Sequence, residues 1–252
     1  MGKNKLKKFA EMETFSNVFQ CGIHDIAPDN PVVQMAGNWR KTYFHNDNPI
    51  VLELGCGRGE YTVGLGKLYP EKNFIGIDIK GARMWAGAKE ADGAGMTNVA
   101  FLRTNIEMLP RFFAQDEVDE IWITFPDPQM KKVGKRLTST GFMERYQQIV
   151  KAGGLIHLKT DSPFLYTYTR EMLRVNQYPV LADTADLYAQ SDYKDAQALQ
   201  THYEHQWLDR GLTIKYLRWA LEPKSTWQEP EIEIEKDTYR SYGRNYVSTT
   251  NN

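Results

Sequence analysis

Cysteine is scarce in this chain, which has two such residues among 252. Cys21 and Cys56 lie far apart in the sequence, and Cys56 is flanked by glycines. This usage indicates neither a disulfide framework nor a cysteine-based metal site, and the histidines show no metal-ligand spacing. We therefore expect two reduced thiols and no bound metal.

Long apolar runs are also missing. No segment approaches the roughly 20 apolar residues that span a bilayer, and no apolar run of signal-peptide length follows Lys3, Lys5, Lys7 and Lys8. These absences predict a cytoplasmic protein without membrane contact. Internal repeats are absent too, and a chain of this length with 41% hydrophobic residues is expected to bury one full core.

Neither sign of charge is in large excess, because the formal net charge is only −1. A surface that binds nucleic acid would therefore have to be local. Two basic stretches qualify: the N-terminal lysines, and residues 129–136, which contain Lys131, Lys132, Lys135 and Arg136 and no acid. A run of like charges is often only a solvated surface, and for the N-terminal lysines that interpretation is equally good.

Strand-like and helix-like segments alternate from residue 50 onward, which predicts an α/β fold with a seven-stranded, mostly parallel sheet and helices on both faces. The expected strands are 50–52, 73–79, 99–103, 120–125, 155–160, one near Val180, and 213–219. The expected helices are 61–69, 82–91, 106–113, 140–151, 163–176 and 201–210. Gly153 and Gly154 are expected to end the helix over 140–151.

The domain organisation follows from these elements. One domain is predicted over residues 31–222, with a basic N-terminal extension over 1–30 and a polar C-terminal tail over 223–252. Residues 181–199 lack periodicity and are expected to form a mobile surface connection, and the last residues are expected to be disordered. His157 lies within a predicted strand and is expected to pack in the core.

A glycine-rich turn is the most informative local feature. The apolar strand over 50–52 leads through Glu53 into Gly55, Gly57 and Gly59. A second strand ends at Asp78, about twenty residues after the turn, where a carboxylate can accept hydrogen bonds from both hydroxyls of a ribose. The pattern predicts a ligand that contains a nucleoside. The alternative interpretation is an unrelated strand-turn-helix with a similar local sequence.

The spacing of the glycines disfavours a dinucleotide ligand. Glu60 stands where the pattern G-x-G-x-x-G needs its third glycine. The arrangement of Glu53, Gly55, Gly57 and Gly59 instead resembles the first motif of class I S-adenosylmethionine (SAM) methyltransferases. That resemblance implies a Rossmann-like fold with an antiparallel last strand, SAM as the cofactor, and Glu53 near the cationic methionine end of SAM.

Polar residues follow the ends of the next strands. Asn105 follows the third strand, Asp127 the fourth and Asp161 the fifth. Ligands of open parallel sheets bind outside the carboxyl ends of the strands, so these residues are candidates for one site. The Asn105 amide suits an adenine edge. Asp127 lies between two prolines and is, by spacing alone, explained equally well as a turn residue.

A longer resemblance is to the bacterial tRNA (guanine-N7)-methyltransferases. The segments that carry it are Phe125-Pro126-Asp127-Pro128-Gln129-Met130-Lys131-Lys132 with Lys135-Arg136-Leu137-Thr138, Gly153-Gly154 with Lys159-Thr160-Asp161, and Thr201-His202-Tyr203-Glu204 with Trp207 and Gly211. The basic extension around Lys5 to Lys8 is similar as well. The chain departs from the family pattern at Gln129, where tryptophan is usual, and at Gly134, where histidine is usual.

This resemblance implies methylation of N7 of a guanosine in the tRNA variable loop, with tRNA as the partner. The implied SAM-binding positions are Glu53, Gly55, Gly57, Asp78, Asn105 and Asp127, and Asp127 is also the implied active-site residue. The implied tRNA-binding positions are Lys131, Lys135, Arg136, Asp161, Thr201 and Glu204.

The chemistry of guanine agrees with these residue types. N7 carries a lone pair, so no general base is needed, and carboxylates such as Asp161 and Glu204 are natural acceptors for the N1-H and N2 amino donors. Lysines and arginine on the loop suit phosphates.

Two alternatives stay open: a class I methyltransferase that acts on another RNA or a small molecule, and a non-catalytic RNA-binding homologue. The sequence is compatible with a monomer or a homodimer.

Overall fold

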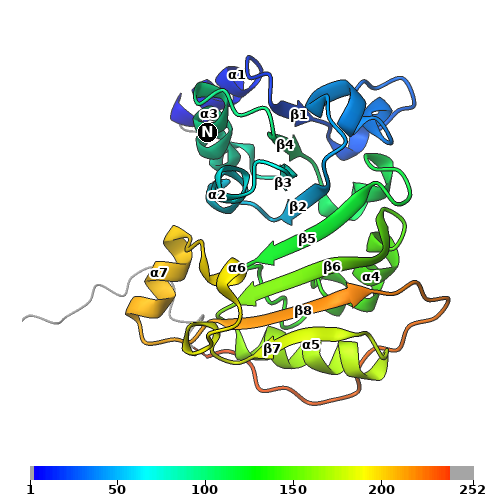
Figure 1. Cartoon of the computed structure of the whole chain (residues 1–252), viewed down its shortest axis with the longest axis vertical. Helices are drawn as coiled ribbons and strands as arrows, with labels where there is room; N and C mark the ends of the chain where they lie inside the picture. Colours follow the sequence, from blue (N-terminus) through cyan, green and yellow to red (C-terminus); the bar gives the residue numbers. More distant parts are fainter. Residues whose placement is uncertain (1–2, 239–252) are drawn as a thin grey trace, which may run out of the picture.

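The computed structural model describes residues 3–238 and contains an eight-stranded sheet in the order β1-β4-β3-β2-β5-β6-β8-β7 (Figure 1). The strands are β1 (Val18–Gln20), β2 (Ile50–Leu54), β3 (Asn73–Ile77), β4 (Val99–Arg103), β5 (Val118–Thr124), β6 (Val150–Thr160), β7 (Val180–Thr184) and β8 (Lys215–Leu221). The helices are α1 (Lys3–Met12), α2 (Glu60–Leu68), α3 (Gly81–Gly93), α4 (Thr140–Tyr146), α5 (Pro163–Val175), α6 (Lys194–Gln197) and α7 (His202–Asp209).

The sheet is mostly parallel, as predicted, and β8 runs antiparallel to both β6 and β7. The chain builds β2, β3 and β4 outward in one direction and then crosses to β5 on the other side of β2. The point between β2 and β5, where the strand order reverses, is where open α/β sheets leave a crevice for ligands.

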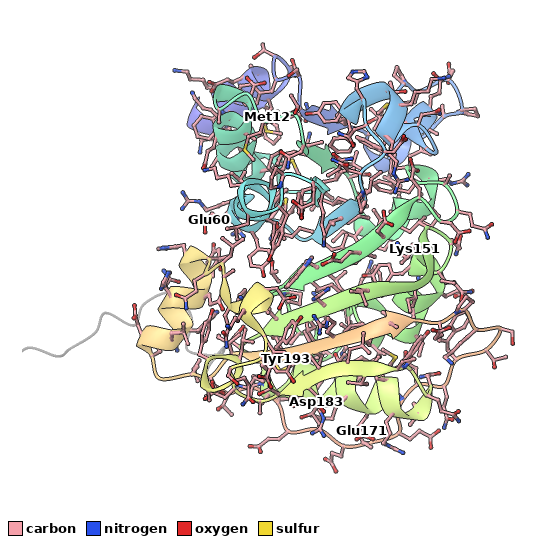
Figure 2. The ribbon with its side chains drawn as sticks, viewed as in Figure 1. Met12, Glu60, Lys151, Glu171, Asp183 and Tyr193 are labelled. Carbon is pink, nitrogen blue, oxygen red and sulfur yellow. The ribbon has the colours of Figure 1, made fainter. Side chains whose placement is uncertain are left out.

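Two hydrophobic cores cover the two faces of the sheet, because alternate side chains of a strand point in opposite directions. In β2, Leu52 belongs to the core that includes residues of α4 and α5, and Val51 belongs to the core that includes residues of α1, α2 and α3. Side chains fill the space on both sides of the strands (Figure 2). His157 is 1% exposed and stacks on Trp122 with ring centroids 3.9 Å apart, which confirms the prediction that it is a core residue.

The predicted count of seven strands is too low by one. The additional strand is β1, which pairs in parallel with β4 through residues such as Val18 and Phe101. Its three residues are too few to show a strand period in the sequence. The N-terminal extension therefore contributes a strand to the sheet, and its helix α1 packs on α3, where Glu11 accepts hydrogen bonds from Trp85 and Lys89.

Two further expectations are wrong. Helix α4 ends at Tyr146, not at residue 151, because Ile149 and Val150 are buried and β6 already begins at Val150, so the glycine pair lies inside a strand. Residues 181–199 are not a loose surface connection, because Leu187 and Ala196 have no exposed surface. Residues 106–111 form a 3-10 helix with Pro110 inside it. The disorder expected at the end of the chain falls on residues 239–252, outside the described residues.

Among residues 3–238, no helix is long and apolar enough to cross a membrane.

Candidate active site

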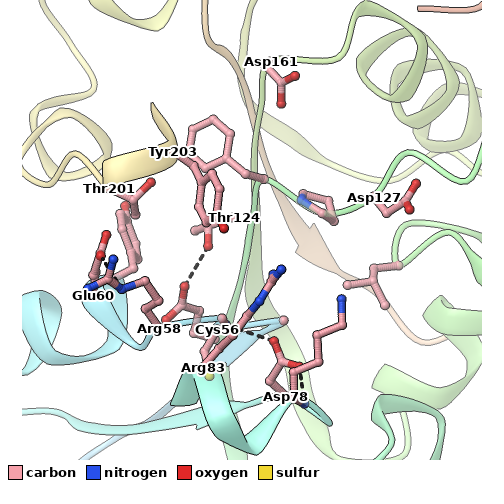
Figure 3. Close-up of a pocket in the computed structure, with 18 of the residues that line it drawn as sticks. Cys56, Arg58, Glu60, Asp78, Arg83, Thr124, Asp127, Asp161, Thr201 and Tyr203 are labelled. Atoms are coloured by element: carbon pink, nitrogen blue, oxygen red, sulfur yellow. Dashed lines mark hydrogen bonds and ion pairs between the residues drawn. The ribbon is translucent and has the colours of Figure 1, made fainter. Parts of the chain in front are cut away.

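A cavity of about 690 Å³ lies outside the carboxyl ends of β2, β3, β5 and β6, at the reversal point of the strand order. Its walls come from the glycine turn after β2, Asp78 after β3, the loop after β5, Asp161 after β6, and the first residues of α7. Figure 3 shows Asp78 at the bottom of this space, Asp127 at the right, Asp161 at the top, and Thr201 and Tyr203 on the α7 side. The sheet thus brings together residues that are more than 140 positions apart in the chain, from Gly55 to Thr201.

The glycine turn owes its shape to backbone conformations that favour glycine. Gly55, Gly57 and Gly59 have φ values of 76°, 55° and 76°. A Cβ atom at Gly59 would lie 2.6 Å from the Phe101 ring, so this glycine lets α3 and β4 approach the turn. A Cβ atom at Gly55 would meet no atom within 4 Å, and Gly55 lines the cavity. Gly59 therefore serves packing, whereas Gly55 leaves the backbone open to a ligand.

Asp78 connects the end of β3 to this turn. One carboxylate oxygen accepts a hydrogen bond of 3.0 Å from the Gly57 N–H, and the other accepts one of 2.7 Å from the Lys80 N–H. These bonds hold the carboxylate at the cavity wall, where it is only half-buried. The arrangement agrees with the predicted ribose contact, which stays a prediction.

Glu53 is the buried carboxylate of the site. It accepts hydrogen bonds from the Thr62 N–H at 2.8 Å and the Thr124 hydroxyl at 2.7 Å, and also from the Thr62 hydroxyl. Burial outweighs these bonds and raises the pKa of Glu53 to about 7. A cationic ligand group beside Glu53 would offset this penalty, which fits the expected methionine end of SAM.

Tyr61 is a second buried polar residue beside the cavity. Tyr61 lines the cavity and is 1% exposed, yet its hydroxyl has no hydrogen-bond partner among the described residues. Burial raises the pKa of Tyr61 well above its ordinary value, so the hydroxyl keeps its proton and can donate. An unpaired buried hydroxyl is costly unless a ligand or water satisfies it.

The loop of residues 125–138, called here the PDP loop, is held in an uncommon conformation. Phe125 and Gln129 have φ values of 49° and 47°, a region that costs non-glycine residues about 1–3 kcal/mol. The Asp127 carboxylate accepts a hydrogen bond of 3.0 Å from the Gln129 N–H and is exposed at the cavity wall. The backbone of Gln129, one of the two positions that depart from the family pattern, therefore holds the turn that presents Asp127.

The basic residues of the PDP loop have different environments. Lys131 is exposed, and Lys135 lies at the cavity wall, 2.7 Å from Glu107. Arg136 is buried, donates hydrogen bonds of 3.2 Å to the carbonyls of Gln129 and Met130, and lies over the Tyr168 ring at 4.3 Å. The expected phosphate contact suits the two lysines, whereas the Arg136 guanidinium already holds the loop together.

The first turn of α7 forms the opposite wall. The Thr201 hydroxyl accepts a hydrogen bond from the Glu204 N–H, and the Glu204 carboxylate accepts one from the Thr201 N–H, a reciprocal capping box. Glu204 is fully buried and also accepts hydrogen bonds from Lys159 and from the Tyr188 hydroxyl at 2.6 Å. Thr201 faces the cavity, but Glu204 points into the protein, where it holds the helix in place.

Several comparisons with known proteins bear on this geometry. The model of a family described as "Putative methyltransferase" matches residues 47–217. The chain is 59% identical over 244 residues to the tRNA (guanine-N(7)-)-methyltransferase of Bacteroides fragilis (strain YCH46), a match that covers 97% of this chain and 96% of the relative. It is 61% identical over 235 residues to the enzyme of the same name from Porphyromonas gingivalis (strain ATCC BAA-308 / W83), covering 92% of this chain and 96% of the relative. The chain belongs to the tRNA (guanine-N7)-methyltransferase family.

Solved structures support the fold of this family member. A 16S rRNA methyltransferase, KamB, aligns with a TM-score of 0.52 at 14% identity and covers 70% of this chain and 89% of its own. A 16S rRNA (adenine(1408)-N(1))-methyltransferase from Catenulisporales acidiphilia aligns with a TM-score of 0.51 at 16% identity, over 75% of this chain and 92% of its own. The Rossmann-like methyltransferase fold expected from the sequence is confirmed.

The family's predicted positions fall into two groups in the described structure. Glu53, Gly55, Gly57, Asp78, Asp127, Lys135, Asp161 and Thr201 line the cavity, whereas Asn105, Lys131, Arg136 and Glu204 do not. The sequence analysis assigned no role to Tyr61, and it named Lys159 only as part of a family motif. A signal was present for Lys159, because a lysine inside a predicted buried strand needs a partner.

Proposed function

We propose that this protein transfers a methyl group from SAM to N7 of a guanosine in tRNA. The observation that carries the proposal is the shared cavity. The glycine turn and Asp78, on the proposed cofactor side, face the same space as Asp161, on the proposed substrate side, and as Asp127, the proposed active-site residue and SAM contact. The activity for which the relatives are named supports tRNA as the substrate, and tRNA as substrate would place the reaction in the cytoplasm.

SAM, when bound, supplies an electrophilic methyl group on a cationic sulfur. Gly55 and Gly57 leave space for a ligand against the backbone, and Asp78 is placed to accept from ribose hydroxyls. Glu53 provides negative charge beneath the turn once it is ionised. Asn105 stays a proposed adenine contact, although it lies outside the cavity lining.

Catalysis of this reaction requires alignment of the reacting atoms more than proton transfer. Guanine N7 attacks with a lone pair in the ring plane, so no base has to remove a proton. Orientation of the reacting groups can be worth roughly 7 to 11 kcal/mol. Positive charge moves onto the purine during transfer, and a fixed carboxylate at Asp127 would favour that movement.

On the substrate side, acids and lysines are proposed to bind different parts of the tRNA. Asp161 lies at the cavity wall and is proposed to accept hydrogen bonds from the N1-H and N2 amino group of guanine. Lys131 and Lys135 are proposed to hold phosphates, and Glu204 to act through the position of Thr201. Bringing N7 to the methyl group requires the base to leave its stack, at a cost of a few kcal/mol.

The test is to incubate the purified protein with SAM and unmodified tRNA, digest the RNA to nucleosides, and measure 7-methylguanosine by mass spectrometry. We expect 7-methylguanosine to form, and to be reduced at least 100-fold by Asp127→Ala, in line with the effect of misaligned reactants. Asp29→Ala, which removes an exposed acid far from the site in sequence, is the matched control.

SAM binding by Asp127→Ala should be measured in parallel by calorimetry. A methylated nucleoside other than 7-methylguanosine would favour the other-substrate alternative. SAM binding without any methyl transfer would refute the proposed reaction, and no SAM binding at all would favour the non-catalytic homologue.

A further inference from the structure

The chain after β8 takes a long course along one side of the molecule. Residues 222–238, called here the C-terminal strap, run as irregular chain past α5, orange to red in Figure 1. The Trp227 indole donates a hydrogen bond of 3.0 Å to the Tyr178 hydroxyl, and Gln228 exchanges two backbone-to-side-chain bonds of 2.8 Å with Asn176. The strap is therefore docked on the C-terminal end of α5 before it turns toward the cavity end of the sheet.

Two acids of the strap, Glu229 and Asp237, accept hydrogen bonds from the rest of the protein, whereas other acids of the strap are exposed. Glu229 accepts hydrogen bonds from the Tyr168 hydroxyl at 2.7 Å and from the Thr140 N–H at 3.2 Å. Asp237 is 6% exposed and accepts from the Phe164 N–H at 3.0 Å and from the Ser162 hydroxyl. Glu231, Glu233 and Glu235 are exposed. Only specific carboxylates of this acidic segment are thus built into the fold.

Both of these acids are connected to the PDP loop by a chain of contacts. The Tyr168 ring, fixed by Glu229 through its hydroxyl, is the surface on which Arg136 lies, and Arg136 donates to the carbonyls of Gln129 and Met130. The Asp237 N–H contacts the Met130 sulfur at 3.3 Å. The strap is therefore linked to Met130 by two routes, and to Gln129 by the route through Tyr168 and Arg136.

Asp237 is also linked to the substrate side of the cavity through Ser162. Its partner Ser162 is the N-cap of α5 and directly follows Asp161, which lines the cavity. The backbone of Asp161 is thereby held between the end of β6 and an anchored N-cap. Since the PDP loop carries Asp127, and Asp161 follows β6, the strap contacts the supports of the proposed active-site acid and of the proposed guanine-binding acid.

We propose that Glu229 and Asp237 are positioning residues for methyl transfer, and that the C-terminal strap holds the PDP loop and Asp161 in the geometry that receives the guanosine. This inference rests on the proposed function, because it assigns the strap to the substrate side of the same site. It separates substrate placement from cofactor binding, since the strap contacts neither the glycine turn nor Asp78 among the bonds of the described residues.

The experiment compares Glu229→Gln and Asp237→Asn with Glu233→Gln, an exposed acid of the same strap. For each variant, kcat and the KM for tRNA are measured by 7-methylguanosine formation, the SAM Kd by calorimetry, and the unfolding midpoint by urea denaturation. We expect the first two variants to lose about 10- to 100-fold in kcat/KM for tRNA, the range that small misplacements cause, with the SAM Kd within about twofold of the wild type. Glu233→Gln should match the wild type.

Tyr168→Phe provides a second test, because it removes the hydroxyl that Glu229 binds and keeps the ring under Arg136. If Glu229 acts through Tyr168, the losses of Glu229→Gln and Tyr168→Phe in log kcat/KM will not add in the double variant. The inference is overturned if Glu229→Gln and Asp237→Asn behave like Glu233→Gln while the wild type is active, or if SAM and tRNA binding fall together with the unfolding midpoint. A wild type that binds SAM but forms no 7-methylguanosine overturns the proposed function, and this inference with it.

Discussion

The ammonium of Lys159 lies 2.9 Å from the Glu204 carboxylate, and neither side chain has any exposed surface. Lys159 also donates hydrogen bonds to the carbonyls of Ala196 at 2.8 Å and Leu199 at 3.0 Å. Through these contacts, one residue of β6 fixes the segment that contains α6 and the first turn of α7. That turn supplies Thr201 and Tyr203 to the cavity wall, so this buried ion pair attaches the wall to the sheet.

Loss of either partner of this pair is expected to destabilise the protein. Lys159→Met or Glu204→Gln leaves the other group buried without its charge partner, which costs about 3–5 kcal/mol in the free energy of unfolding. Urea denaturation measures it. Lys151→Met removes a half-exposed lysine from Asp119, which keeps Arg40 as a partner, and should cost less than about 1 kcal/mol. Equal, small losses for all three variants would contradict this account.

The raised pKa of Glu53 predicts a pH dependence of stability. Its ordinary value is 4.5 and its folded value is about 7, so between these pH values the folded state keeps a proton that the unfolded chain releases. Stability therefore falls as pH rises from about 4.5 to 7, by about 3 kcal/mol for this group, and the loss is constant above pH 7.

Glu53→Gln removes this titration and keeps the shape of the side chain. Urea denaturation at pH 5 and pH 8 measures the free energy of unfolding of both proteins. Relative to the wild type, the variant should be more stable at pH 8 than at pH 5. A difference that does not change between the two pH values would show that Glu53 ionises normally in the folded protein.

Two glycines of the turn are expected to respond differently to alanine. Gly59→Ala places a Cβ 2.6 Å from the Phe101 ring and 3.2 Å from the Gly87 Cα, and should lower the free energy of unfolding by about 1–3 kcal/mol beyond the φ penalty. Gly55→Ala meets no neighbour, so only the penalty for its positive φ remains, about 1 kcal/mol.

SAM calorimetry separates the two glycine variants further. Gly55→Ala adds a methyl group at the cavity wall and should weaken SAM binding more than its small effect on stability explains. Unchanged SAM affinity in Gly55→Ala would argue that the cofactor does not approach this backbone.

The exposed lysines of the PDP loop are expected to govern the salt dependence of tRNA binding. Each phosphate contact contributes roughly 0.7 to 0.9 to the slope of log K against log salt concentration. The double variant Lys131→Ala, Lys135→Ala should lower the magnitude of that slope by about 1.5 and leave the SAM Kd unchanged. Filter binding over a series of salt concentrations measures it, with Lys67→Ala, an exposed lysine of α2, as the control.

Arg136 is expected to behave differently from these lysines. Its guanidinium is buried and binds two loop carbonyls, so Arg136→Lys should lower kcat for tRNA methylation while the salt slope changes by less than about 0.5. If the magnitude of the slope falls as much as it does for a single exposed lysine, Arg136 contacts a phosphate after all.

Local sequence was sufficient for the features that depend on local chemistry. Glycines at positions 55, 57 and 59 require a turn with positive φ, and their spacing from Asp78 is set by one helix and one strand. The parallel orientation of β2 to β6 was predicted from the alternation of helices and strands, whereas their order in the sheet was not. The resemblance in residues 125–138 and 201–211 identified the family.

Tertiary structure decided which charged groups face the cavity and which are buried. Arg136 and Glu204 have the same sequence character as Lys135 and Asp161, yet Arg136 is covered by Tyr168, and Glu204 by Lys159 and Tyr188. Their partners lie in other elements, 16 to 45 residues away in the chain for Glu204. Burial of a charge depends on what packs over it, and that becomes defined only when distant segments such as α7 and the C-terminal strap meet the sheet.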